Sequence, residues 1–111
     1  MRRQALATLA LLAATTALSA CVYDAAKPMV FYDNNSAETV VVEVEGADRP
    51  TDMTLESGTT AGSGANDCLG TAIVVHTQDG TLVGRVDEPA CPFWKLVINA
   101  DGTLDYQELD H

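Results

Sequence analysis

The chain has 111 residues, and its sixteen aspartates and glutamates outnumber the six lysines and arginines, which gives a formal net charge of −10. So few cations exclude nucleic acid as a partner, because that affinity depends on neutralising phosphates with lysine and arginine. The length corresponds to one small domain rather than two.

The first residues have the features of an export signal. The basic segment of residues 1–4 is followed by an uncharged apolar run over residues 5–18. At about 14 residues, the run is shorter than the roughly 20 that a helix needs to cross a bilayer, and it ends in small residues. We therefore expect residues 1–20 to be a cleaved signal peptide. The arginine pair within residues 1–4 leaves the general and the twin-arginine export routes both open.

The segment Leu18-Ser19-Ala20-Cys21 resembles the lipobox of bacterial lipoproteins. The resemblance implies that a diacylglycerol donor alkylates the Cys21 thiol and that a peptidase cuts before this residue. The acyl chains would anchor the protein stably, because each buried methylene contributes about 0.8 kcal/mol. We expect residues 21–28 to be a lipidated tether and the domain to lie on the extracytoplasmic side of the cell membrane or outer membrane. The alternative is an ordinary signal peptide followed by a chance cysteine.

The mature part is strongly acidic. Loss of the signal removes two arginines and leaves four cations against sixteen acidic residues, a formal charge of −12. This charge repels anionic lipid headgroups, so we expect the acyl chains at Cys21 alone to hold the protein at the membrane. The acidity either keeps an exported protein soluble or attracts a basic partner.

The folded domain is expected to occupy residues 29–111, and its first half has strand patterns. Residues 29–32 are a compact apolar run, residues 33–36 are a turn cluster, and valines alternate with other residues over 38–45. These segments predict a hairpin. A short strand is predicted at residues 53–55.

Residues 57–67 are rich in glycine, serine and threonine, and they predict the longest loop. This loop is either a passive connector or a binding loop. Two hairpins follow, each with an Asp-Gly pair between apolar alternations, which is a strong hairpin signal. They pair residues 71–77 with 81–87, and residues 93–99 with 103–109. Both turns are expected to need positive φ, which aspartate and glycine tolerate.

With Cys21 assigned to lipid, Cys68 and Cys91 form an even pair in an exported protein, which predicts a disulfide. On the chain-entropy model this bond would contribute roughly 3 kcal/mol. The alternative is a metal site that uses both thiols and His76. The spacing of the cysteines disfavours it, since no close Cys-x-x-Cys pair is present.

No segment has a convincing apolar stripe at helical spacing, and valine and threonine favour strands. The predicted fold is therefore all-β: a small antiparallel β-sandwich of immunoglobulin-like form, or a compact barrel, with six to seven strands and one disulfide. The predicted core consists of Val40, Val42, Val44, Ile73, Val75, Leu82, Val86, Trp94, Leu96, Ile98, Leu104 and Tyr106.

Residues 99–108 resemble the second part of an EF-hand calcium loop, with Gly102 at its sixth place and Glu108 at its twelfth. The first place, however, is Val97 instead of an aspartate, and the flanking residues alternate as a strand. We therefore expect a hairpin here and no metal. No nucleophile-base pattern includes the two histidines, His76 and His111, or Ser63, which lies between two glycines. We expect no catalytic residue and no cofactor.

These observations favour a non-enzymatic, monomeric lipoprotein whose β domain serves as a binding or structural module of the cell envelope, with an envelope protein as its candidate partner. In size, anchor, charge and fold class the chain is similar to membrane-bound lysozyme inhibitors. That similarity implies a second hypothesis, an inhibitor of a basic envelope enzyme such as lysozyme. A variant of it is a prophage- or plasmid-borne exclusion lipoprotein that blocks an entry factor. An enzyme is the third hypothesis.

Overall fold

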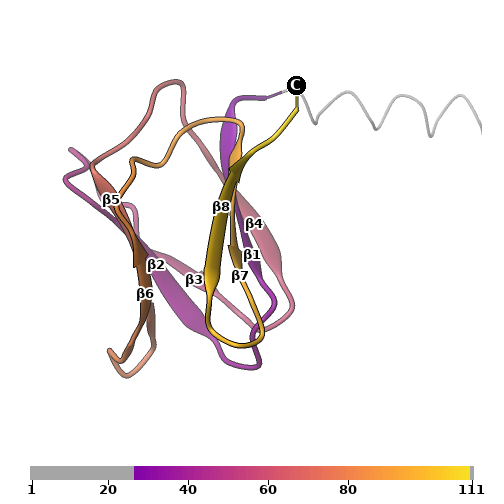
Figure 1. Ribbon diagram of the computed structural model, residues 1–111. Coiled ribbons are helices and arrows are strands. Elements are labelled where there is room, and N and C mark those ends of the chain that lie inside the picture. Colours follow the sequence, from indigo (N-terminus) through magenta and orange to yellow (C-terminus); the bar gives the residue numbers. More distant parts are fainter. Residues whose placement is uncertain (1–26, 111) are drawn as a thin grey trace, which may run out of the picture.

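The computed structural model describes residues 27–110, and these residues form strands and no helix. The strands are β1 (Met29–Asn34), β2 (Val40–Glu45), β3 (Met53–Leu55), β4 (Thr60–Gly64), β5 (Ala72–Thr77), β6 (Leu82–Val86), β7 (Trp94–Ile98) and β8 (Leu104–Glu108). They are arranged as two sheets that face each other (Figure 1). The all-β prediction is confirmed.

Each sheet has four strands. The first has the order β4-β1-β7-β8, and the second has the order β3-β2-β5-β6. Neighbouring strands are antiparallel except for β1 and β7, which are parallel. The architecture is a two-layer sandwich rather than a closed barrel, and it has eight strands where six to seven were expected. A constant-type immunoglobulin domain has seven, divided four and three.

The predicted hairpin of residues 29–45 is wrong. β1 pairs with β4 and β7, whereas β2 pairs with β3 and β5 in the other sheet. The turn cluster between them therefore carries the chain across the sandwich. Its buried residue, Asn34, ends β1, and the side chain holds the crossing segment through hydrogen bonds. A turn signature in the sequence does not distinguish a hairpin from a crossover.

The two Asp-Gly hairpins are confirmed as β5–β6 and β7–β8. Their turns have the same geometry. The N–H of Thr77 donates to the Thr81 carbonyl, and the N–H of Asn99 donates to that of Thr103. Only the glycines have positive φ in these turns, 92° for Gly80 and 87° for Gly102. The loops are therefore three-residue turns in which aspartate needs no left-handed conformation, contrary to our expectation.

The loop predicted for residues 57–67 contains a strand, β4, so this prediction is also wrong. β4 pairs with β1 in a continuous register from Met29 opposite Gly64 to Asp33 opposite Thr60. Its glycine, serine and alanine residues have low strand propensity, and the backbone ladder to β1 overrides that propensity. The short strand predicted at residues 53–55 is confirmed as β3.

The core lies between the sheets and is made mostly of alternate residues of the central strands, to which Leu55 of β3 and two alanines of the connections are added. It consists of Val30, Tyr32, Val40, Val42, Val44, Leu55, Ala65, Ile73, Val75, Ala90, Leu96 and Ile98. Of the remaining predicted core residues, Val86, Leu104 and Tyr106 pack against this cluster while partly buried. Trp94 is half-buried, and its ring lies 4.7 Å from that of Tyr106.

Leu82 is 62% exposed, so its predicted place in the core is wrong. The cause is a β-bulge in the pairing of β5 with β6. Val75 is opposite Gly84, but the next residue, His76, is opposite Leu82, which leaves Val83 as the extra residue. Because side chains alternate between the faces of a strand, one extra residue moves Leu82 to the outer face. Val83 packs against the core instead.

Candidate functional site

The sandwich has two different ends, which we name by their contents. The terminal end holds residues 27–28 and 109–110 together with the connections 46–52, 65–71 and 87–93. The turn end holds the connections 35–39, 56–59, 78–81 and 99–103. Figure 1 shows the C-terminus and the start of β1 together at the terminal end, with the hairpin turns at the opposite end. Residue 27 therefore lies at the end of the sandwich opposite the hairpin turns.

The predicted disulfide is confirmed at the terminal end, where Cys68 is bonded to Cys91 across 23 positions of sequence. It joins the β4–β5 connection to the β6–β7 connection. Next to it, Leu69 and Ala90 exchange two backbone hydrogen bonds of 2.8 and 2.9 Å. Closing a loop of this length stabilises the fold by roughly 3 kcal/mol on the chain-entropy model. The disulfide therefore fixes two connections that cross between the sheets.

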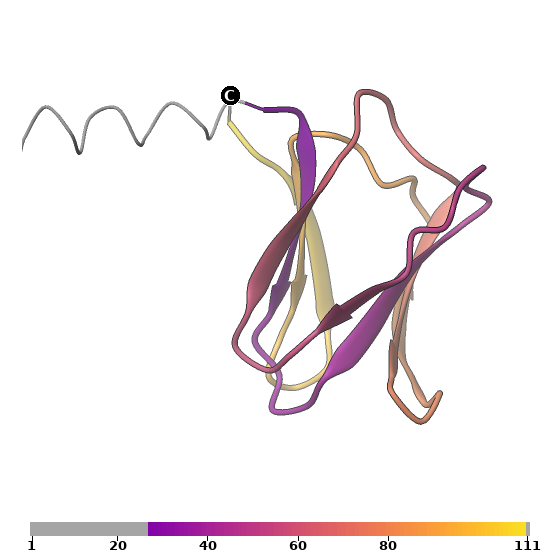
Figure 2. The same ribbon diagram turned by 180° about the vertical axis from the view of Figure 1, so that it is seen from behind.

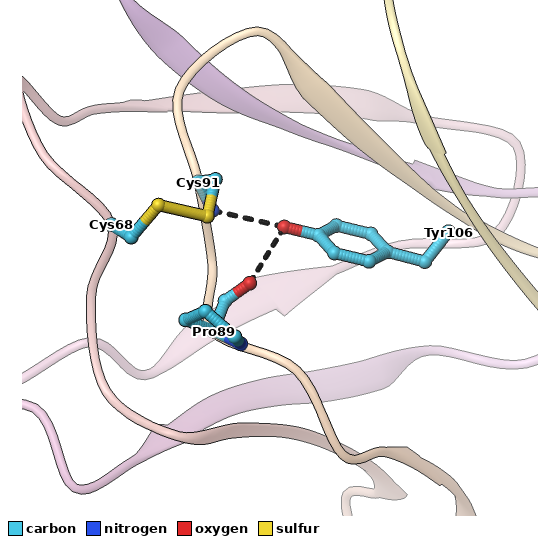
Figure 3. Close-up of a disulfide and its surroundings, with 4 residues drawn as sticks. All are labelled: Cys68, Pro89, Cys91 and Tyr106. Carbon is cyan, nitrogen blue, oxygen red and sulfur yellow. Dashed lines mark hydrogen bonds between the residues drawn. A yellow bond between two sulfur atoms is a disulfide. The ribbon is translucent and has the colours of Figure 1, made fainter.

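Tyr106 of β8 holds the same corner through its hydroxyl group. Figure 3 shows this hydroxyl between the two backbone groups that it binds: it accepts from the Cys91 N–H at 2.9 Å and donates to the Pro89 carbonyl at 2.8 Å. Partial burial raises the pKa of Tyr106. The phenol thus stays neutral and keeps its donor at physiological pH. This role explains why a predicted core residue is only partly buried.

The turn end is organised by Asn34, which the sequence analysis did not single out. Its amide nitrogen donates to the carbonyls of Glu38 and Leu55, and its amide oxygen accepts from the backbone N–H and hydroxyl of Ser36. The backbone of Asn34 also binds Gly58 and Thr59. One fully buried residue therefore connects β1 to the two crossover connections of this end.

The two hairpin turns of the turn end are fixed by their aspartates. Asp79 accepts from the hydroxyl of Thr77 and from the N–H of Thr81, and Asp101 accepts from the N–H and hydroxyl of Thr103. These bonds favour the ionised forms, so the hydroxyl of Thr77 lowers the pKa of Asp79 and that of Thr103 lowers the pKa of Asp101. Both turns present fixed negative charges to solvent.

The turn end carries exposed carboxylates and no lysine or arginine. The carboxylates belong to Glu38, Glu56, Asp79 and Asp101. Between two connections lies an open hollow of about 470 Å³, lined by Glu38, Thr39, Thr77, Gln78, Asp79 and Thr81. The hollow therefore combines negative charge with hydroxyl and amide groups that donate and accept hydrogen bonds.

The cations of the described residues lie elsewhere. Lys27 and Arg49 are at the terminal end, and the Arg49 side chain donates to the Gly64 carbonyl at 3.0 Å. Arg85 binds Glu45 at 2.7 Å and Asp87 at 2.6 Å, and Lys95 binds Asp33 at 3.2 Å. The two ends therefore differ in their cations rather than in their acidity. The connections of the turn end have carboxylates alone, whereas those of the terminal end combine Lys27 and Arg49 with the carboxylates of Asp48, Asp52, Asp67, Asp87, Glu88 and Asp110.

The remaining sequence candidates are structural residues or lie outside the described part. Asn99 donates to Asp105, which fixes the hairpin that was compared with an EF-hand. Within residues 27–110, no group of three or more His, Cys, Asp or Glu side chains is placed to hold a metal ion. Ser63 lies within β4. Cys21 and His111 fall outside the described residues.

His76 lies on the outer face of the second sheet, apart from the turn end. Its ring nitrogens face the Thr77 carbonyl at 2.8 Å and a Glu43 carboxylate oxygen at 3.0 Å. Because both neighbours are acceptors, first the carbonyl and then the carboxylate raise the pKa of His76. His76 and Glu43 thus bind each other on the sheet surface, and they form an ion pair when the imidazole is protonated.

Comparisons of the chain with protein-family models, with curated proteins and with solved structures find no match. The part of the chain that the structure describes also has no helix with the length and apolar character needed to cross a bilayer.

Proposed function

We propose that the chain is a lipid-anchored protein of the bacterial cell envelope, attached through Cys21, and that its acidic sandwich is a non-enzymatic binding module. Support for the anchor comes from the basic residues 1–4, the apolar run 5–18 and the lipobox-like residues 18–21. The membrane is the cell membrane or the outer membrane, and the domain is on the extracytoplasmic side.

The position of the termini gives this proposal an orientation. Lys27 lies six positions after Cys21 in the sequence, and even a fully extended chain of that length spans only about 20 Å. A lipid at Cys21 would therefore keep the terminal end close to the membrane. The turn end would point away from it and be accessible to other envelope components.

The negative turn end is the observation that carries the binding proposal. Its carboxylates have no cation among them, and Asp79 and Asp101 are fixed by their turns. Charge complementarity then favours a basic partner and speeds its association. The same charge supports a second candidate function, inhibition of a basic envelope enzyme such as lysozyme, or exclusion through a basic uptake factor.

A capture experiment tests the proposal with a charge-neutral variant of the turn end, Glu38→Gln with Asp79→Asn and Asp101→Asn. Asparagine retains the oxygen that accepts the turn hydrogen bonds, so the hairpins are preserved. A tag after residue 111 lies at the terminal end, away from the site. If three exposed ion pairs contribute about 0.5 kcal/mol each, partner affinity should fall about tenfold.

The matched control removes the same charge at the terminal end, with Asp48→Asn, Asp67→Asn and Glu88→Gln. These side chains are all exposed. Capture of envelope proteins by the tagged full chain should be retained in this control. Equal capture by the wild type and both variants would refute a role for the turn end. An equal loss in both variants would mean that only the overall charge matters.

A further inference from the structure

The free edge of β4 differs from the other three sheet edges. β3 has three residues, β6 is bulged and carries Arg85, and β8 carries Asp105 and Glu108. Short edges, bulges and charges are the features that limit strand addition to a sheet. β4 has the sequence Thr-Ala-Gly-Ser-Gly, with no charge, bulge or proline. Figure 2 shows it as the outermost strand of its sheet.

The hydrogen-bond pattern of β1 and β4 shows which backbone groups face outward. The backbone N–H of Asn34 donates to the Thr59 carbonyl, and the backbone N–H of Ala65 donates to the Pro28 carbonyl. The odd-numbered residues of the segment 59–65 therefore point their backbone groups toward β1. In an antiparallel ladder the intervening residues point the other way. Thr60, Gly62 and Gly64 therefore direct their N–H and C=O groups to the free edge, where the Gly64 carbonyl already accepts from Arg49.

From this edge we infer that β4 pairs antiparallel with β4 of a second copy of the chain, about a two-fold axis at Gly62. In this register Gly62 exchanges both hydrogen bonds with its equivalent, and Thr60 lies opposite Gly64. A two-fold interface requires such a self-complementary surface. The oxygen of Gly64 has a second lone pair for the new bond. Two four-stranded sheets would then become one continuous sheet of eight strands.

The side chains beside the edge also fit a second copy. Met29 and Phe31 of β1 lean over Gly62: a Cβ placed there would lie 2.8 Å from the Met29 Cε and 3.4 Å from the Phe31 ring. Because Gly62 would face Gly62 across the seam, the Met29 and Phe31 side chains of both copies could meet above it. A larger residue at this position would separate them.

Charge determines how the association depends on salt. The described residues contain fifteen acidic side chains and four basic ones, so two copies repel each other at long range. At the seam the repulsion is small, since β4 is uncharged and the neighbouring Asp33 is bound to Lys95. Salt screens the long-range term and leaves backbone hydrogen bonds intact. Dimerisation should therefore strengthen as salt increases, whereas binding of a basic peptide to the same edge would weaken.

Photo-crosslinking of the full chain in its host envelope tests the partner. A benzophenone amino acid replaces Gly64 on β4 or, as the control, Gln107 on β8; both positions are exposed edge residues. Two differently tagged forms are co-expressed. We expect an adduct that carries both tags from position 64 and no such adduct from position 107. An adduct at position 64 that contains only a different protein, or no adduct, would overturn this inference.

Sedimentation of the detergent-solubilised full chain tests the edge itself. The wild type should shift from monomer toward dimer between low salt and about 0.5 M salt. Gly64→Pro removes an outward N–H without removing a bond to β1, so it should stay monomeric at both salt concentrations with an unchanged melting temperature. Wild-type monomer at both concentrations, or a dimer of Gly64→Pro as stable as that of the wild type, would contradict the pairing. These outcomes do not depend on whether the turn end binds a partner.

Discussion

A buried amide at Asn34 holds the turn end together, although the segment looks like an ordinary polar turn. Three of its four side-chain hydrogen bonds are to the crossover connection 35–39, and the fourth is to Leu55 at the end of β3. Burying this amide without its hydrogen bonds would lower the free energy of unfolding, because an unpaired buried polar group loses its hydration. The local sequence contains no signal that separates Asn34 from Asn35, since burial is decided by the sheets on either side.

Replacement of Asn34 by alanine should lower the free energy of unfolding by about 2 to 3 kcal/mol, because the Glu38 and Leu55 carbonyls lose their donor. Asn35→Ala, at an exposed neighbouring position, should change it by less than about 0.5 kcal/mol. Urea unfolding of both variants measures the difference. Similar values for the two would show that the amide network does not stabilise the fold.

Tyr32 makes the stability of the fold dependent on alkaline pH. Burial, with a smaller contribution from Tyr106, raises the pKa of Tyr32 to about 12. A raised folded-state pKa gives stability that is present below pH 10 and is lost as the pH rises toward 12. The loss should be roughly 2 to 3 kcal/mol. Unfolding free energies measured across this pH range should fall more steeply for the wild type than for Tyr32→Phe; parallel curves would exclude Tyr32 as the cause.

At the scale of strands, the bulge in β6 makes Leu82 differ in burial from Val42, although both were predicted as core residues from the alternation of apolar residues. Leu82 is exposed, whereas Val42 is fully buried. Leu82→Thr should therefore change the free energy of unfolding by less than about 0.5 kcal/mol, while Val42→Ala should lower it by about 2 kcal/mol. Denaturant titration measures both. A cost for Leu82→Thr as large as that for Val42→Ala would mean that the bulge does not form in solution.

Local patterns predicted the elements that depend on local chemistry. The Asp-Gly turns fix β5–β6 and β7–β8, and valine alternation fixes β2. The patterns failed where pairing between distant segments decides the structure. β4 owes its conformation to the ladder with β1, and the partner of β1 is chosen by the crossover at Asn34. A bulge also leaves no clear signature, since Gly84 alone does not indicate where alternation shifts.

The same distinction applies to the candidate site. The disulfide could be predicted, because the assignment of Cys21 to lipid leaves Cys68 and Cys91 as a single pair. The turn end could not, because Glu38, Glu56, Asp79 and Asp101 come from four separate connections. Only the topology brings these charges to one end and the cations Lys27 and Arg49 to the other. The cations, rather than the acidic residues, are therefore segregated in the fold, because the terminal end also carries carboxylates such as Asp48, Asp67 and Glu88.

For the whole molecule, this segregation is useful only if the terminal end is the one attached to the membrane. The anchor at Cys21 would make that attachment and would leave the turn end, whose connections carry carboxylates and no cation, accessible. Lipidation at this residue is thus the central claim, and the orientation and the binding proposal both rest on it.

Metabolic labelling with an alkyne-bearing palmitate tests lipidation of Cys21 most directly, using the full-length chain and its Cys21→Ser variant in a bacterial host. We expect the wild type to be labelled and to have the mass of a mature chain that begins at Cys21, whereas the variant should be unlabelled and keep the mass of the precursor. Equal labelling of both chains, or a wild-type chain with an unmodified Cys21, would contradict this claim.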